Sequence, residues 1–256
     1  MSLRIEFCGV PASGKSTLCA AAVNALRARG RRVLDREDVV KMGLSARDFG
    51  LVGNAVGRLF PAWRRRVLGL PHGLNDWHAF AVERPAFVAL LHEWLAVEGG
   101  DSVWRSAIFY ALLTSAFELQ FAEASRETAL LDEGFAHRFF SLRGYRGLGR
   151  NEDAARYAAA MPLPAALIWV DTPPEVCVER VQKRAQMPVL FSGEPADILP
   201  QRFAEGSALL RSLADAVAAR GVPVFRASGI ERVESEAQRL AEFVETIWAD
   251  AKRETQ

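Results

Sequence analysis

The sequence has few of the residues that build disulfide or zinc frameworks, with three cysteines and four histidines among 256 residues. Cys8, Cys19 and Cys177 stand far apart in apolar surroundings and show neither a C-x-x-C pair nor a cysteine–histidine spacing. This pattern argues against a disulfide-stapled fold and against a zinc site. We expect the cysteines to be small buried hydrophobic residues of a protein in a reducing compartment.

An excess of one charge is also missing, because 32 lysines and arginines stand against 31 aspartates and glutamates. A long nucleic acid would call for many basic residues along one face, so we expect no such partner. The longest apolar run, Ala107 to Phe117, is too short to span a bilayer, and no charged and apolar leader follows Met1. The sequence therefore favours a cytoplasmic protein without a membrane partner.

What the sequence does contain is a phosphate-binding pattern near its N-terminus. Residues 9–17 read Gly-Val-Pro-Ala-Ser-Gly-Lys-Ser-Thr and match G-x-x-x-x-G-K-S/T. The apolar run Leu3–Cys8 predicts a strand before the pattern, and Leu18–Leu26 predicts a helix after it. Glycines let successive backbone N–H groups turn around a polyphosphate, and the helix N-terminus adds partial positive charge. The pattern therefore predicts nucleotide binding.

Each residue type in this loop has a physical role toward a bound nucleotide. Lys15 supplies a point charge to the terminal phosphates and is a predicted catalytic residue, while Ser16 supplies a hydroxyl to Mg²⁺. The residues of the loop that we predict to contact the nucleotide are Gly9, Pro11, Ala12, Ser13, Gly14, Lys15, Ser16 and Thr17.

A first acidic stretch, residues 35–38 with the sequence Asp-Arg-Glu-Asp, follows a short predicted strand at Arg31–Leu34. Ligands of open α/β sheets bind outside the carboxyl ends of the strands, so we expect these acids to face the phosphate loop. Asp38 and Asp35 are therefore candidate catalytic bases. The alternative is an acidic helix start that complements the helix dipole.

A second acidic stretch, Asp132-Glu133-Gly134, ends a predicted third strand that begins at Thr128. An acid at the end of a strand beside a phosphate loop commonly holds Mg²⁺ directly or through water. Asp132 is the predicted metal ligand, together with Ser16.

Between these two stretches, from about residue 42 to 126, the spacing of apolar residues predicts packing helices and no strand. The segment Leu70–Asp76 is predicted to be a turn or loop, because it contains proline and glycine. Tryptophans in this region either wall an aromatic pocket for a flat ligand or form the core of the helical layer. They are Trp63, Trp77, Trp94 and Trp104.

A basic helix beside a breakable loop follows the fourth predicted strand, Ala165–Val170. Arg180, Lys183 and Arg184 lie on neighbouring turns, and the proline- and glycine-containing stretch 187–200 comes next. Paired basic residues beside such a loop are what a lid over nucleotide phosphates needs, so we predict that Arg180 and Arg184 are catalytic and that Arg180 contacts the nucleotide. The alternative is a solvated helix face.

The order of these pieces, closed by a fifth strand at Val222–Arg226, resembles the P-loop kinase superfamily of nucleoside, nucleotide and small-molecule kinases over most of the chain. The resemblance implies an α/β three-layer sandwich with a five-stranded parallel sheet, helices on both faces and a helical insertion after strand two. It also implies one domain over residues 1–256, with an acceptor-binding insertion at about 42–126 and a lid at about 180–202. ATP and Mg²⁺ are the implied cofactors.

Local matches support this resemblance. The phosphate loop looks like those of deoxynucleoside, polynucleotide and small-metabolite kinases. Residues 171–175 with Arg180 and Arg184 are similar to the lid entry of thymidylate kinases, and Ala227-Ser228-Gly229 is similar to the loop that cradles adenine there. Residues 38–41, Asp-Val-Val-Lys, are similar to the D-x-x-R/K of adenylylsulfate and polynucleotide kinases, where the acid is the acceptor's base.

At several positions the sequence differs from the kinase families that it resembles. Thymidylate kinases carry an acid within the phosphate loop and an Asp-Arg after strand three, whereas this chain has Ala12-Ser13 and Asp132-Glu133. Deoxynucleoside kinases have an arginine where Glu133 stands. The acceptor's identity therefore does not transfer from these families.

The predicted function is transfer of the γ-phosphoryl group of ATP to a small acceptor, first a nucleoside or nucleotide. The alternatives are a kinase of another small metabolite or antibiotic hydroxyl, and a P-loop ATPase in which Glu133 activates water. The chain has no Leu-Ser-Gly-Gly-Gln signature, which argues against a motor, and no Asn-Lys-x-Asp motif, which argues against a GTP switch. A homodimer is compatible with the sequence.

Overall fold

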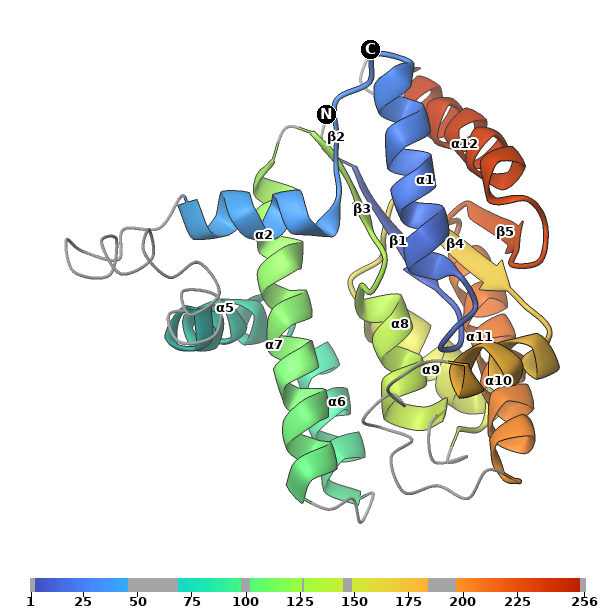
Figure 1. Ribbon diagram of the computed structural model, residues 1–256. Helices are drawn as coiled ribbons and strands as arrows, with labels where there is room; N and C mark the ends of the chain where they lie inside the picture. The colour runs from blue at the N-terminus through green and yellow to red at the C-terminus, as the bar shows by residue number, and fades with distance from the viewer. Residues whose placement is uncertain are drawn as a thin grey trace.

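The computed structural model describes residues 3–45, 69–97, 102–125, 127–144, 149–183 and 197–253. A five-stranded sheet with the order β2-β3-β1-β4-β5 forms its centre, and every neighbouring pair of strands is parallel (Figure 1). The strands are β1 Arg4–Cys8, β2 Val33–Leu34, β3 Thr128–Leu131, β4 Ala166–Asp171 and β5 Val224–Ser228. The predicted α/β fold with a five-stranded parallel sheet is confirmed.

Helices connect the strands and cover the sheet. In chain order they are α1 Lys15–Ala28, α2 Arg36–Ser45, α5 Gly69–Glu83, α6 Pro85–Val97, α7 Ser102–Ala124, α8 Phe135–Phe139, the π-helical turn η2 Phe140–Gly144, α9 Asn151–Ala160, α10 Pro174–Gln182, α11 Leu199–Ala218 and α12 Val233–Arg253.

The two faces of the sheet are covered by different helices. On one face Ile5, Phe7 and Ile168 are fully buried in a core shared with α1 and α12, which lie side by side in Figure 1. On the other face Leu167 and Trp169 belong to a larger core built with α8, α9 and α11. Strands buried on both faces have almost continuous apolar sequences, as β4 has. In β1, Arg4 and Glu6 are buried as well and form an ion pair with each other. The predicted three-layer arrangement is confirmed.

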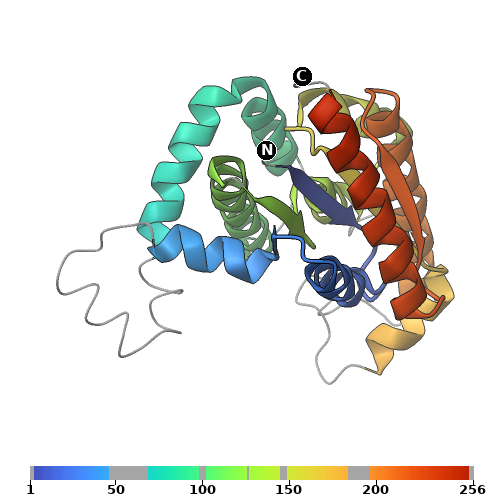
Figure 2. The ribbon, with the colours of Figure 1, turned by 90° about the horizontal axis from the view of Figure 1, so that it is seen from above.

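The helices α2, α5, α6 and α7 form an insertion between β2 and β3, as the sequence predicts. They lie beside the β2–β3 side of the sheet, away from α12 (Figures 1 and 2). The predicted loop at Leu70–Asp76 is wrong, because these residues form the first turns of α5. Pro71 falls in the first turn, where a missing backbone N–H leaves no helical hydrogen bond unmade.

The described tryptophans of the insertion belong to its core. Trp77, Trp94 and Trp104 are each at most 9% exposed, and Trp94 stacks on Tyr157 with ring centroids 5.6 Å apart. Burial of these three side chains in the helical layer agrees with the second of the two interpretations, that they form its core. Trp63 lies outside the described residues.

Cys8, Cys19 and Cys177 are free thiols and are buried, as expected from their apolar surroundings. Within the described ranges, no helix is long and apolar enough to cross a membrane.

Candidate active site

The phosphate loop joins the end of β1 to the start of α1 and needs its glycines for two different reasons. Gly14 has φ +98°, a left-handed conformation that favours glycine. At Gly9 a Cβ atom would lie 2.6 Å from Ser13 Oγ and 2.9 Å from the Val170 carbonyl oxygen, so there is no room for a side chain. The Ser13 N–H donates to the Val10 carbonyl oxygen at 3.1 Å and closes the turn. The motif thus forms a compact loop in front of a helix N-terminus.

Lys15 begins α1 and is buried, with 7% of its surface exposed. Burial lowers the pKa of its ammonium group, and the nearby carboxylates of Glu133 and Asp132 oppose that shift. Ser16 and Thr17, the next two residues of the first turn, are exposed. The motif lysine is therefore shielded from solvent and lies close to both acids that follow β3.

Two neighbouring segments hold the phosphate loop through its carbonyl groups. The Thr172 hydroxyl, just after β4, donates to the Ser13 carbonyl oxygen at 2.8 Å. Arg180 of α10 donates from Nη1 to the Ala12 carbonyl oxygen at 3.3 Å and from Nη2 to the Gly229 carbonyl oxygen at 2.9 Å. Arg180 thus links the phosphate loop to the loop between β5 and α12, and the predicted residues of three separate segments come together.

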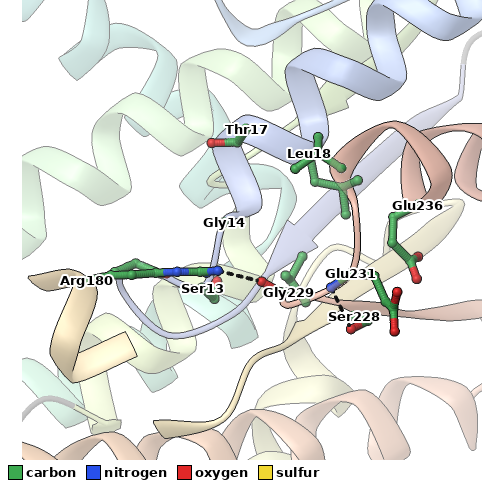
Figure 3. A pocket seen from close by; sticks show the side chains of 12 residues that line it. Ser13, Gly14, Thr17, Leu18, Arg180, Ser228, Gly229, Glu231 and Glu236 are labelled. Carbon is green, nitrogen blue, oxygen red and sulfur yellow. Dashed lines mark hydrogen bonds between the residues drawn. The ribbon is translucent and has the colours of Figure 1, made fainter. Parts of the chain in front are cut away.

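A cavity of about 330 Å³ lies between these two loops. In Figure 3, Arg180 extends from α10 toward Gly229, and the carboxylates of Glu231 and Glu236 lie on the opposite side. Glu236 has 2% of its side chain exposed, and its Oε1 accepts a hydrogen bond from Arg239 at 2.6 Å. The residues that line the cavity are Ala12, Ser13, Gly14, Thr17, Leu18, Val170, Arg180, Ser228, Gly229, Glu231, Val233 and Glu236.

Glu133, the second acid after β3, is held by arginines from two other elements. Glu133 Oε2 lies 3.5 Å from Arg36 Nη1, at the start of α2, and 3.5 Å from Arg138 Nη2, on α8. Arg138 Nη2 also donates to the Glu133 carbonyl oxygen at 3.2 Å. Arg138 therefore fixes both the backbone and the side chain of Glu133.

The long insertion helix α7 supports both arginines. Arg36 Nε donates to Glu118 Oε1 at 2.6 Å, and Arg138 Nε donates to Ser115 Oγ at 2.9 Å. Ser115 and Glu118 are three residues apart on α7 and so lie on one face of the helix. Glu118 is fully buried, and this burial raises the pKa of its carboxyl group while Arg36 opposes the shift.

Gly134 allows the chain to turn between these acids and α8. Glu6 of β1 is buried, and its Oε2 accepts a hydrogen bond from the Ala136 backbone N–H at 2.8 Å, at the start of α8. A Cβ atom on Gly134 would lie 2.2 Å from the Glu6 carboxyl carbon. The glycine of the Asp-Glu-Gly stretch is thus required by the close approach of a buried carboxylate.

His137 lies on α8 and is buried. Burial, with Lys15 and Arg138 adding to it, holds the pKa of this imidazole well below its usual range, and a hydrogen bond with the Gly9 backbone opposes the shift. The imidazole is therefore neutral and packs behind the loop.

Asp35 and Asp38 form a reciprocal cap at the start of α2. Asp35 Oδ1 accepts the Asp38 backbone N–H at 2.8 Å, and Asp38 Oδ2 accepts the Asp35 backbone N–H at 3.3 Å. Arg27 forms ion pairs with both carboxylates. Arg27 lies in the last turn of α1 and Lys15 in its first, a separation of about 18 Å along the helix axis. A catalytic role for either acid stays a prediction.

The predicted Mg²⁺ ligands, Ser16 and Asp132, offer oxygen atoms at the phosphate loop and at the end of β3. Mg²⁺ prefers oxygen ligands and is usually held by one or two protein groups together with phosphates and water, so this donor set fits it. In the described part of the chain, no group of three or more His, Cys, Asp and Glu residues could hold a metal by itself. Arg184, predicted to belong to a lid, lies outside the described residues.

Sequence reasoning gave no role to several side chains that hold the site together. They are Arg36, Arg138, Ser115, Glu118 and Thr172. Only Glu118 carries a signal in the sequence, because an acid three residues after Ser115 interrupts the apolar stripe of a predicted helix. The others become visible only through contacts between distant segments.

No protein-family model matches the sequence, and no curated protein has a significantly similar sequence. Solved structures do match. One is a deoxyadenosine kinase from M. mycoides with the products dCMP and a flexible dCDP bound, at 10% identity and a TM-score of 0.51, covering 95% of this chain and 100% of that chain. Another is a shikimate kinase from Bacteroides thetaiotaomicron, at 14% identity and a TM-score of 0.42, covering 96% and 99%. The first match shows that this chain shares the fold of that kinase.

Proposed function

We propose that the protein is a P-loop kinase that transfers the γ-phosphoryl group of ATP to a small acceptor. The observation that carries the proposal is the buried Lys15, which follows a phosphate loop at the end of β1, the strand beside β3 and its acids. Phosphoryl transfer depends mostly on positioning and on charge neutralisation, and this arrangement supplies groups for both. The fold supports the same proposal.

In this proposal the adenine base enters the cavity between Arg180 and the loop Ala227-Ser228-Gly229. The planar guanidinium of Arg180 is held in place by two carbonyl oxygens and can stack on a flat ring. The phosphates then reach the backbone N–H groups of the phosphate loop and the ammonium group of Lys15.

Ser16 and Asp132 are the residues that would hold Mg²⁺, which when bound neutralises charge on the phosphates. Lys15 would orient the terminal phosphates from the opposite side. Arg184 remains a proposed lid residue, within a proposed lid at about residues 180–202.

A nucleoside or nucleotide is the first candidate acceptor, and the deoxyadenosine kinase with a similar fold supports testing it first. The second candidate is another small metabolite or an antibiotic hydroxyl. The buried tryptophans of the insertion give no support to aromatic stacking of the acceptor. A homodimer in the cytoplasm remains part of the proposal.

The test measures ADP release from Mg·ATP in the presence of nucleosides, nucleoside monophosphates, sugars and aminoglycosides. We expect one class to raise the rate above that with water alone. Binding of ATP should also raise the thermal stability, since a ligand at a hundredfold its Kd stabilises a protein by about 2.7 kcal/mol. Steady ADP release that no acceptor changes would favour the ATPase alternative instead.

A further inference from the structure

The two acidic stretches of the site have different surroundings, and the difference bears on which of them receives the acceptor. Asp35 and Asp38 cap the start of α2 and pair with Arg27. Both acids thus hold the start of α2 and pair with Arg27 in the last turn of α1.

The two carboxylate oxygens of Glu133 have different surroundings, since Oε2 forms its ion pairs. Both of its ion pairs, with Arg36 and with Arg138, are made to Oε2 at 3.5 Å. Over the described ranges, no hydrogen bond or ion pair reaches Oε1, and 34% of the side chain is exposed. A carboxylate held in this way can accept a hydrogen bond from a ligand hydroxyl without moving.

Glu133 also lies near the start of the phosphate loop. β3 pairs with β1 in the register Glu6↔Leu131, and the Ala136 backbone N–H donates to Glu6, so the residues that follow β3 lie beside the end of β1, where the loop begins. A ligand hydroxyl on Oε1 would therefore lie near the phosphate loop.

The helical insertion keeps this carboxylate in position through its two arginines. Ser115 and Glu118 of α7 hold Arg138 and Arg36, each through the Nε atom, and leave the Nη atoms for Glu133. Gly134 then turns the chain against the buried Glu6 carboxylate. Two elements thus contact the Glu133 side chain, and a third, α7, holds both of their arginines in place.

We propose that Glu133, rather than Asp38, receives the acceptor, and that the acceptor is an alcohol rather than a phosphomonoester. The inference rests on the proposed kinase function. The acceptor oxygen forms a bond to the γ-phosphorus while the bond from that phosphorus to the β–γ bridging oxygen breaks. ADP leaves with the bonding electron pair, and the hydroxyl proton passes to the Glu133 carboxylate and then to water.

The charges around Glu133 favour a neutral acceptor. An alcohol donates a hydrogen bond to a carboxylate, whereas a phosphomonoester brings a second negative charge against it. Arg36 and Arg138 are already paired with Glu133, and Arg36 is paired with Glu118 as well. Among the candidate acceptors, this favours nucleosides, sugars and other alcohols over nucleoside monophosphates.

The experiment compares Glu133→Gln with Asp38→Asn as a matched pair of carboxylate-to-amide changes. Mg·ATP binding is measured by calorimetry, and ADP release is measured with water alone, with alcohols (adenosine, deoxycytidine, glucose, kanamycin) and with phosphomonoesters (AMP, dTMP, glucose 6-phosphate). We expect Glu133→Gln to lower kcat by about 10²-fold, the usual scale of a lost proton acceptor, with the Kd for ATP unchanged. Asp38→Asn should keep the parent kcat, and only alcohols should stimulate the parent.

Three results would overturn the inference alone: full kcat in Glu133→Gln, the loss in Asp38→Asn instead, or stimulation by phosphomonoesters rather than alcohols. A parent that does not bind Mg·ATP would overturn the proposed function itself. Should Glu133→Gln unfold, Glu133→Asp keeps the charge and withdraws the carboxylate by one methylene. That variant should show a lower kcat with unchanged ATP affinity, and an unaltered kcat in it would overturn the inference as well.

Discussion

Main-chain groups build the proposed nucleotide half of the site, whereas charged side chains build the proposed acceptor half. In the first half Thr172 and Arg180 hold carbonyl groups of the phosphate loop, so the loop itself would form the binding surface. In the second half Glu133 is held by arginines that α7 supports from behind. One half depends on backbone conformation and the other on ion pairs.

Because of this difference, the two halves should tolerate different substitutions. A backbone cradle is damaged by any side chain that fills its space, as at Gly9 and Gly229. An ion-pair network is damaged by the loss of one charge, because the remaining partner stays buried without compensation. Substitutions in the first half should therefore act on ATP affinity, and those in the second half on turnover.

The largest effect is expected where the halves meet, at Lys15. Lys15→Ala removes the buried charge between the phosphate loop and the acids after β3, so both ATP affinity and turnover should fall, turnover by on the order of 10²-fold or more. Calorimetry with Mg·ATP and ADP release give the two readings. Lys252→Ala, in the exposed last turn of α12, is the control. Equal ATP affinity in Lys15→Ala and the parent would refute the role of the phosphate loop.

The next effect should be confined to the nucleotide half. In Gly229→Ala the new methyl group would lie 1.6 Å from Thr172 Oγ1 and 2.6 Å from the Ser13 carbonyl oxygen. Overpacking of this kind costs about 1–3 kcal/mol, so ATP should bind about tenfold more weakly while kcat at saturating ATP is retained.

Gly221→Ala is the control for this change, because Gly221 has φ +81° but nothing within 4 Å of a new Cβ. It should lower stability by about 1–2 kcal/mol through backbone strain and leave ATP affinity unchanged. Equal losses of ATP affinity in the two variants would mean that Gly229 acts only through general stability.

The nucleotide half could be predicted from sequence because its requirements fall on adjacent residues. A buried strand, two glycines at fixed spacing, a lysine and a helix follow one another without a gap, and the structure has this order from Arg4 to Ala28. The five parallel strands could be predicted for a similar reason, since each is a short apolar run with a turn after it.

The acceptor half could not be predicted in this way. Arg36 and Glu133 are 97 residues apart, and no local pattern says that they meet. The stretch at residues 35–38 and the stretch at residues 132–133 look alike in sequence, as acids after strands. Only the structure shows that one pairs with Arg27 and caps a helix, while the other pairs with Arg36 and Arg138.

A smaller effect concerns the pH dependence of stability, through the buried Glu118 that holds Arg36 in the proposed acceptor half. Burial raises the pKa of Glu118 against the influence of Arg36, so the folded state binds this proton more tightly than the unfolded state. The unfolded chain releases this proton at about pH 4.3, whereas the folded protein keeps it to a higher pH. The free energy of unfolding therefore falls as pH rises between these two pKa values and is constant above the higher one. Glu118→Gln has no such titration.

Urea unfolding of Glu118→Gln and the parent between about pH 4 and 7 tests this. The stability of the variant relative to the parent should rise with pH through that interval and then level. Glu179→Gln, at an exposed position on α10, is the control. A relative stability that falls with increasing pH would mean that Arg36 outweighs burial at Glu118.

The smallest effect on turnover is expected at the start of α2. Asp35→Ala removes the helix cap, which is worth about 1 kcal/mol, and should lower the Tm by roughly 2–4 °C. Asp38→Asn keeps the size of the side chain and removes half of a partly exposed ion pair with Arg27, a contribution of about 0–1 kcal/mol. In the arrangement proposed above, neither acid belongs to either half of the site, so both variants should keep the parent kcat and KM for ATP. Glu37→Gln, at the exposed partner of Lys41 on the same helix, controls for the charge change. A kcat lowered in Asp38→Asn but not in Glu37→Gln would restore Asp38 as the base and move the acceptor toward the end of β2.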